Sequence, residues 1–212
     1  MQVQYDEDFL EASVFLAASG QRPGVPALQL ARFHREREKL YDILGPDERS
    51  AAFFRLHLEW FREWGLERPL RTVLGEFPLL REQLTVLAVH QAPTEREEGA
   101  ELYVNPEGQR TGVLALRRDR LRNDNVCTRF LRHEFSHLHD LLNPAFGYAP
   151  ALELPGLNQA QQRLAGERYR LLWDITIDGP RPQRAHALRT APTLRRGVPA
   201  RLLLLVRGAA DN

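Results

Sequence analysis

The stretch VCTRFLRHEFSHLHDLL, residues 126–142, determines which fold we expect for this 212-residue chain. An asparagine or aspartate at 123–125 can cap a helix that begins here, and the Asn-Pro pair at 143–144 can end it. His133 and His137 are four residues apart, so both imidazoles point from the same face of that helix. The stretch therefore predicts one helix that presents a pair of histidines.

The same residues form the motif HExxH, with Glu134 directly after the first histidine. Two imidazoles one helical turn apart can bind one Zn²⁺ at about 2.0–2.1 Å. Glu134 then lies beside the open coordination position, where a carboxylate can take a proton from the attacking water and pass it to a leaving amine. We therefore expect His133 and His137 as metal ligands and Glu134 as the general base.

A catalytic zinc site needs a third protein ligand, and a second predicted helix, at about 159–178, offers three carboxylates. Glu167, Asp174 and Asp178 are spaced by seven and four residues, which places them on one helical face. Bulky apolar residues surround the last two, and an acid in the last helical turn is disfavoured by the helix dipole unless a cation is near. All three carboxylates are therefore candidate ligands.

In these features the chain resembles the zincin metallopeptidases, and specifically their gluzincin-like members, in which a downstream helix supplies the carboxylate ligand. The resemblance implies an ExxxD frame, which reads Asp174-Ile-Thr-Ile-Asp178 here, so that Asp174 would be the ligand and Asp178 would orient a zinc-bound histidine. Aspartate is shorter than the usual glutamate, which keeps Glu167 and Asp178 as alternative ligands. The metzincin extension is absent because Asn143 stands where its third histidine would be. The resemblance covers about residues 84–180 and extends to small, poorly characterised bacterial zincin-like proteins.

The remaining patterns favour an α+β fold that is mostly helical and zincin-like, with a small mixed or antiparallel sheet before the HExxH helix. Apolar residues recur at three and four positions over about 6–74, which predicts helices. The run at 84–90 is typical of a buried strand, and shorter strands are predicted at 101–104 and 112–116. The resemblance implies that an edge strand holds an extended substrate, and we expect 112–116 to be that strand.

We expect three regions: a helical N-terminal region at 1–80 that packs on the core, a zincin-like metal-binding core at 81–179, and a basic extension at 180–212. The extension holds seven arginines and one acid, a formal charge of +6, while the whole chain has a net charge of +1. It lacks interleaved aromatic residues and any recognisable reading module, so we expect no nucleic-acid partner. The oligomeric state is not predicted by the sequence.

A single cysteine, Cys127, excludes an intramolecular disulfide and fits a reducing compartment. The first residues, MQVQYDED, carry acids where a secretory signal needs positive charge and an apolar run, and no stretch approaches 18 consecutive apolar residues. We therefore expect a cytoplasmic protein of bacterial type with no membrane partner.

Further residues are assigned roles from their positions. Tyr148, in a Phe-Gly-Tyr loop, can donate a hydrogen bond to a tetrahedral intermediate, although such a tyrosine more often packs structurally. His139 should point away from the metal face. Asp140 points within about 20° of the direction of His133 around the helix axis and can support the site. Tryptophans at 60 and 64 and the histidines at 34, 57 and 90 are expected in the core or at its boundary.

The sequence thus predicts a zinc-dependent metallopeptidase that hydrolyses peptide or protein substrates by metal-activated water. The alternative is a zincin-fold protein that binds metal without protease activity and serves a structural or partner-binding role. One departure supports this alternative, because the ligand position at Asp174 lacks the usual glutamate.

Overall fold

The computed structural model describes residues 1–147 and 156–178 and forms two compact units, Met1–Leu138 and His139 onward. The expected boundary near residue 80 is not where the chain divides, because the strand at its N-terminus joins the same sheet as the strands of the expected core. The fold is mostly helical with a small mixed sheet, so the expected α+β class is confirmed.

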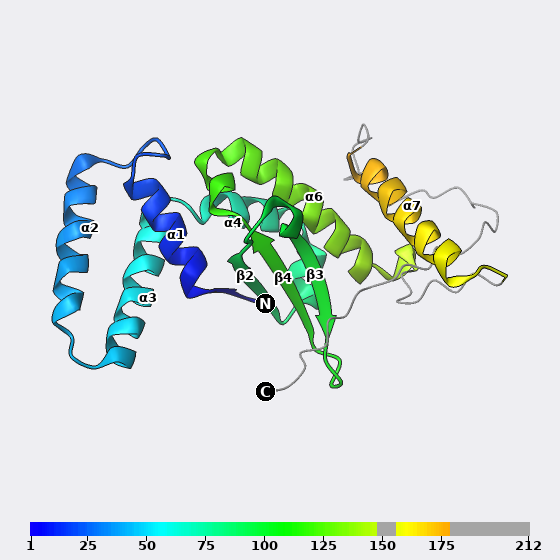
Figure 1. Cartoon of the computed structure of the whole chain (residues 1–212), viewed down its shortest axis with the longest axis horizontal. Coiled ribbons are helices and arrows are strands. Elements are labelled where there is room, and N and C mark those ends of the chain that lie inside the picture. The colour runs from blue at the N-terminus through cyan, green and yellow to red at the C-terminus, as the bar shows by residue number, and fades with distance from the viewer. Residues whose placement is uncertain (148–155, 179–212) are drawn as a thin grey trace. The chain divides into compact units, whose positions relative to one another are not determined.

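The first unit begins with β1 (Gln2–Tyr5) and continues through five helices before the rest of the sheet. These helices are α1 (Glu7–Ala18), α2 (Ala27–Lys39), α3 (Pro46–Glu63), α4 (Arg68–Gly75) and α5 (Pro78–Gln83), with the short helix η1 (Leu40–Asp42) between α2 and α3. Figure 1 shows α1, α2 and α3 together on one side of the sheet, at the left of the view. The helical first third was therefore predicted well, although β1 was missed.

Aromatic side chains hold these N-terminal helices together. Phe33 of α2 lies fully buried, with its ring centroid 5.9 Å from Trp60 and 5.3 Å from Trp64. Trp60 and Trp64 are themselves buried, which confirms their expected place in the core. His57 is buried beside them, whereas His34 is exposed, so its expected core or boundary position is wrong.

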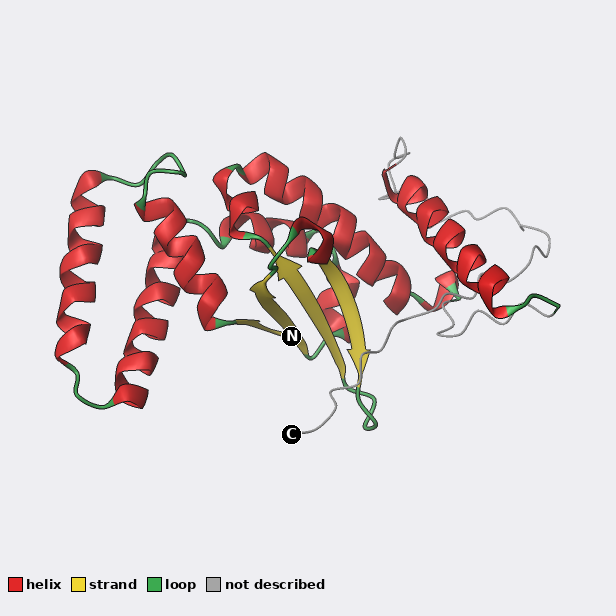
Figure 2. Ribbon diagram, in the orientation of Figure 1, coloured by secondary structure: helices red, strands yellow, loops and turns green. Residues whose placement is uncertain are grey.

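The sheet contains four strands in the order β1-β2-β4-β3, shown in yellow in Figure 2. β2 (Val86–Gln91) runs parallel to β1 and to β4 (Arg110–Leu116), while β3 (Gly99–Val104) runs antiparallel to β4. The expectation that residues 112–116 form an edge strand is wrong, because β4 lies between two partners and β3 is at the edge. The three strands that were predicted, β2, β3 and β4, lie within two residues of the predicted boundaries.

Helix α6 (Asp124–Leu142) has three fully buried side chains, Leu131, Phe135 and Leu138. A Cβ at Gly112 in β4 would lie 3.6 Å from the Leu138 side chain, an ordinary van der Waals contact. The same Cβ would lie 3.0 Å from Leu84, in the segment that leads into β2. The absence of a side chain at Gly112 therefore leaves room for the Leu84 side chain.

The second unit contains the last turn of α6, the short helix η4 (Pro144–Phe146) and α7 (Gln159–Asp178). Its core is built on Trp173 and Ile177, against which Leu141, Phe146 and Tyr169 pack. Both long helices that carry the predicted site residues therefore exist with nearly the predicted boundaries. The expected basic extension at 180–212 lies outside the described residues, and no helix among those described is long and apolar enough to cross a membrane.

Candidate metal centre

The histidine pair sits in the middle of α6, whose start is capped as the sequence suggested. The side chain of Asn123 accepts hydrogen bonds from the backbone N–H groups of Asn125 at 2.9 Å and Val126 at 3.2 Å, which satisfies two of the free donors at the helix start. From this capped helix His133 and His137 project together as half-buried side chains. The expected common direction of the two imidazoles is therefore observed.

The spacing of the two rings suits a shared ion. The Nε2 atoms of His133 and His137 are 3.2 Å apart. Two nitrogens bound to one tetrahedral zinc at about 2.0–2.1 Å would be separated by roughly 3.3 Å, close to this value. The separation of the two nitrogens is therefore close to the one that a common metal ion requires.

Asp174 of α7 is the third residue of a group that could hold a metal ion. One ligand atom from each of His133, His137 and Asp174 lies within 4.8 Å of the others, and all three side chains are half-buried. Two imidazole nitrogens and one carboxylate oxygen form a donor set that suits zinc among the divalent ions, although other transition metals use the same ligands. This group can hold a metal ion.

Asp174 follows Trp173, which anchors its turn of α7. The indole N–H of Trp173 donates to Asp140 Oδ2 at 2.9 Å, and its ring stacks on Phe146 with centroids 5.5 Å apart. Asp140 lies in the last turn of α6, three residues after His137. Asp140 was expected to support the site, and in this structure it holds the residue next to Asp174.

Glu134 contacts the edge strand. Its Oε2 accepts a hydrogen bond from the backbone N–H of Ala100 at 2.8 Å, at the beginning of β3. A Cβ at the preceding Gly99 would lie 3.6 Å from the same oxygen. The backbone of β3, an edge strand, therefore orients the Glu134 carboxylate, which is the expected general base.

A buried ion pair fixes the start of that strand. Glu98 has a side chain only 1% exposed, and Arg120 donates to it from Nε at 3.2 and 3.1 Å and from Nη2 at 2.9 Å. The backbone N–H of Arg117 also donates to Glu98, at 3.0 Å. The sequence did not predict this ion pair, because Glu98 and Arg120 are 22 positions apart and no local pattern connects them.

The other predicted site residues have different surroundings. Glu167 is exposed and pairs with Arg163 of the same helix at 3.4 Å, so it is not part of the donor group. Asp178 ends α7, but its side chain lies outside the described residues, as does Tyr148. The Nδ1 atom of His139 lies 3.5 Å from Asp140 Oδ1.

Two further features of the described chain lie apart from this group. Burial raises the pKa of the Cys127 thiol to about 12, which leaves it protonated and unsuited to act as a nucleophile or metal ligand.

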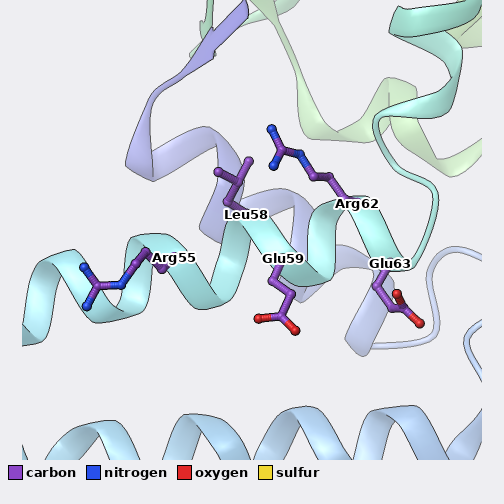
Figure 3. Close-up of a pocket in the computed structure, with 5 residues that line it drawn as sticks. All are labelled: Arg55, Leu58, Glu59, Arg62 and Glu63. Atoms are coloured by element: carbon purple, nitrogen blue, oxygen red, sulfur yellow. The ribbon is translucent and has the colours of Figure 1, made fainter.

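A cavity of about 460 Å³ lies along α3, where Figure 3 shows Leu58 and Arg62 on one side of the helix and Glu59 and Glu63 on the other. Charges of both signs line it, as on an ordinary solvated helix face.

Comparison of the chain with family models, with curated proteins and with solved structures found no match.

Proposed function

We propose that this chain is a zinc-dependent metallopeptidase, with His133, His137 and Asp174 as the ligands and Glu134 as the general base. One observation carries the proposal: two imidazole nitrogens 3.2 Å apart share a helix with Glu134, and the Asp174 carboxylate lies in the same donor group. Three protein ligands leave a coordination position for water or substrate, as in catalytic zinc sites.

When bound, zinc would supply a Lewis acid that polarises the substrate carbonyl and makes water acidic enough to attack near neutral pH. The residues of this chain perform the remaining tasks. Glu134 takes the proton from the attacking water and delivers it to the amine that leaves. The Ala100 N–H keeps the Glu134 carboxylate in one orientation for both transfers, because it holds one oxygen at 2.8 Å.

The substrate is an extended peptide that pairs with β3. This strand ends the order of strands in the described sheet, so its outer side is available for strand addition. The N–H groups of alternate residues in a strand point to the same side, so Leu102 and Val104 present theirs on the side of the Ala100 N–H. A peptide aligned there would run past Glu134.

The first experiment measures metal content and cleavage with the full chain. We expect the purified protein to bind about one zinc per chain and to cleave members of a broad peptide library, with activity lost after chelation. Glu134→Gln should retain the zinc and lose cleavage by at least about 100-fold, because general acid–base catalysis contributes roughly that much or more. Glu107→Gln, in the exposed turn between β3 and β4, is the matched control and should remain active.

The ligand assignment is tested by zinc titration of two variants in α7. Asp174→Asn should weaken zinc binding by at least about 10-fold, since a neutral amide replaces a charged ligand. Glu167→Gln should bind zinc like the unmodified chain, because Glu167 pairs with Arg163. Stoichiometric zinc without any cleavage would favour the alternative of a structural metal site, and failure to bind zinc would refute both functions.

A further inference from the structure

The side chains of the edge strand β3 alternate between the two faces of the sheet. Leu102 is buried and is in register with the buried Gly112 of β4, so these two residues share the buried face. Neighbouring side chains of a strand point to opposite faces, which places Glu101 and Tyr103 together on the other face. Glu101 is exposed there. The edge strand therefore presents a carboxylate on the face opposite the buried one.

The Glu101 carboxylate is held by its neighbour on the same face. The hydroxyl of Tyr103 donates a hydrogen bond to Glu101 Oε2 at 2.5 Å. No ion pair joins Glu101 to an arginine, lysine or histidine in the part of the chain that the structure describes. A carboxylate that is positioned but not paired with a cation is suited to a basic group of a ligand.

The strand beside β3 adds no charge on this face. Glu101 is in register with Val113 of β4, and Tyr103 with Thr111. By the alternation of side chains, the described residues of β3 and β4 on this face are Gly99, Glu101, Tyr103, Thr111, Val113 and Ala115. Glu101 is the only charged residue among them. These two strands therefore present a single negative charge, which favours a ligand group of the opposite sign.

The backbone of β3 determines which part of a docked peptide meets this charge. A peptide added at the edge exchanges hydrogen bonds with Leu102, and its neighbouring residue then lies opposite Glu101 with its side chain on the same face. The Cβ atoms of such opposite residues are about 4.5–5.5 Å apart, within reach of a long basic side chain. Glu101 directly follows Ala100, whose N–H binds Glu134. The peptide residue beside Glu101 therefore lies close to the bond on which Glu134 would act.

We propose that Glu101 determines specificity by selecting peptides that carry arginine or lysine within about three residues of the cleaved bond. The inference rests on the peptidase function proposed above and names the substrate class of that site. The basic side chain pairs with the Glu101 carboxylate across the two strands, whereas an acidic residue at the same position is repelled.

The first test measures kcat/KM of the zinc-loaded full chain on variants of one peptide that it cleaves. Arginine, glutamine or glutamate is placed in turn at each of the three positions on either side of the cleaved bond. At one position we expect arginine to exceed glutamate by at least about 5-fold at low salt, since unlike charges attract and like charges repel across a strand pair. About 0.5 M salt should reduce this ratio, because exposed charges are screened.

A reversal of charge assigns the preference to Glu101. Glu101→Lys should favour glutamate over arginine at the same position, an outcome that a misfolded variant cannot produce. The control is Glu38→Lys, which changes the net charge equally and is exposed in the last turn of α2, a helix that α1 and α3 separate from the strands in Figure 1. It should keep the preference for arginine. Cleavage without any such preference, or a preference unchanged in Glu101→Lys, would refute the inference and leave the peptidase function standing.

Peptide binding to the chelated chain separates the role of Glu101 from catalysis. Without zinc the chain should not cleave, so the fluorescence anisotropy of a labelled peptide reports docking alone. The arginine peptide should bind at least about 5-fold more tightly than the glutamate peptide, and Glu101→Lys should reverse this order. Such binding without cleavage by the zinc-loaded chain would support the role of Glu101 and refute the peptidase. Equal affinities, or no binding at up to about 0.5 mM protein, would overturn the role of Glu101.

Discussion

Replacing Arg120 with methionine tests whether the buried ion pair holds the edge strand in place. The change removes three nitrogen–oxygen contacts of 2.9 to 3.2 Å from Glu98 but keeps a side chain of similar length. The Glu98 carboxylate, 1% exposed, would then keep only the hydrogen bond from the Arg117 N–H and the longer ion contact of Arg117 at 3.8 Å. Breaking such a buried pair costs about 3–5 kcal/mol, and we expect about 3 because Arg120 is partly exposed.

The measurement is urea denaturation of the full chain followed by circular dichroism. With a slope of about 2 kcal/mol per molar, a loss of about 3 kcal/mol lowers the midpoint by roughly 1.5 M. Arg118→Met, two residues earlier and exposed, should shift it very little. Combining Arg120→Met with Glu98→Gln should recover part of the loss, since the amide carries no charge yet still accepts from the Arg117 N–H. A loss below about 1 kcal/mol for Arg120→Met would refute the assigned role.

Three further changes test other parts of the structure. His57 has a pKa of about 4 in the folded chain and about 6.5 when unfolded, so the unfolded state binds more protons between these values. The contribution of neutral His57 to the free energy of unfolding should therefore be fully present above pH 6.5 and should fall by roughly 3 kcal/mol as the pH drops toward 4. Denaturation of His57→Phe at the same pH values should not show this fall. Gly112→Val places a Cβ 3.0 Å from the Leu84 side chain and should lower the free energy of unfolding by about 1–3 kcal/mol in thermal denaturation, whereas Gly75→Ala, with nothing within 4 Å, should not. Trp173→Phe removes the hydrogen bond to Asp140 and should cost about 1–3 kcal/mol, measured by the same method; an unchanged melting temperature would show that this bond contributes nothing.

The helices were predictable because their signals are local. Asn123 caps α6 within the predicted region, and the periodic apolar residues of α6 and α7 gave boundaries within two residues. The position of His57 in the core followed from the apolar face of α3. In each case the residues that decide the structure lie within one or two turns of one another.

The order of the strands was not predictable because it depends on distant contacts. β1 has only four residues, QVQY, and its parallel pairing with β2 joins positions more than 80 residues apart. Residues 112–116 were expected at the edge because of the zincin resemblance, yet β2 and β3 pair with both sides of β4. The strand that begins at Gly99 therefore takes the edge, beside Glu134.

Helical periodicity could not identify the third donor either. A spacing of seven residues returns Glu167 and Asp174 to one helical face, so the sequence alone cannot separate them. They are nevertheless about 10 Å apart along the axis, too far for both to reach one ion. The hydrogen bond from Trp173 to Asp140 selects the turn of α7 that is held beside the last turn of α6, and Asp174 belongs to that turn. Glu167 lies two turns away, where it meets Arg163, so a contact between side chains 33 positions apart makes the distinction that the pattern left open.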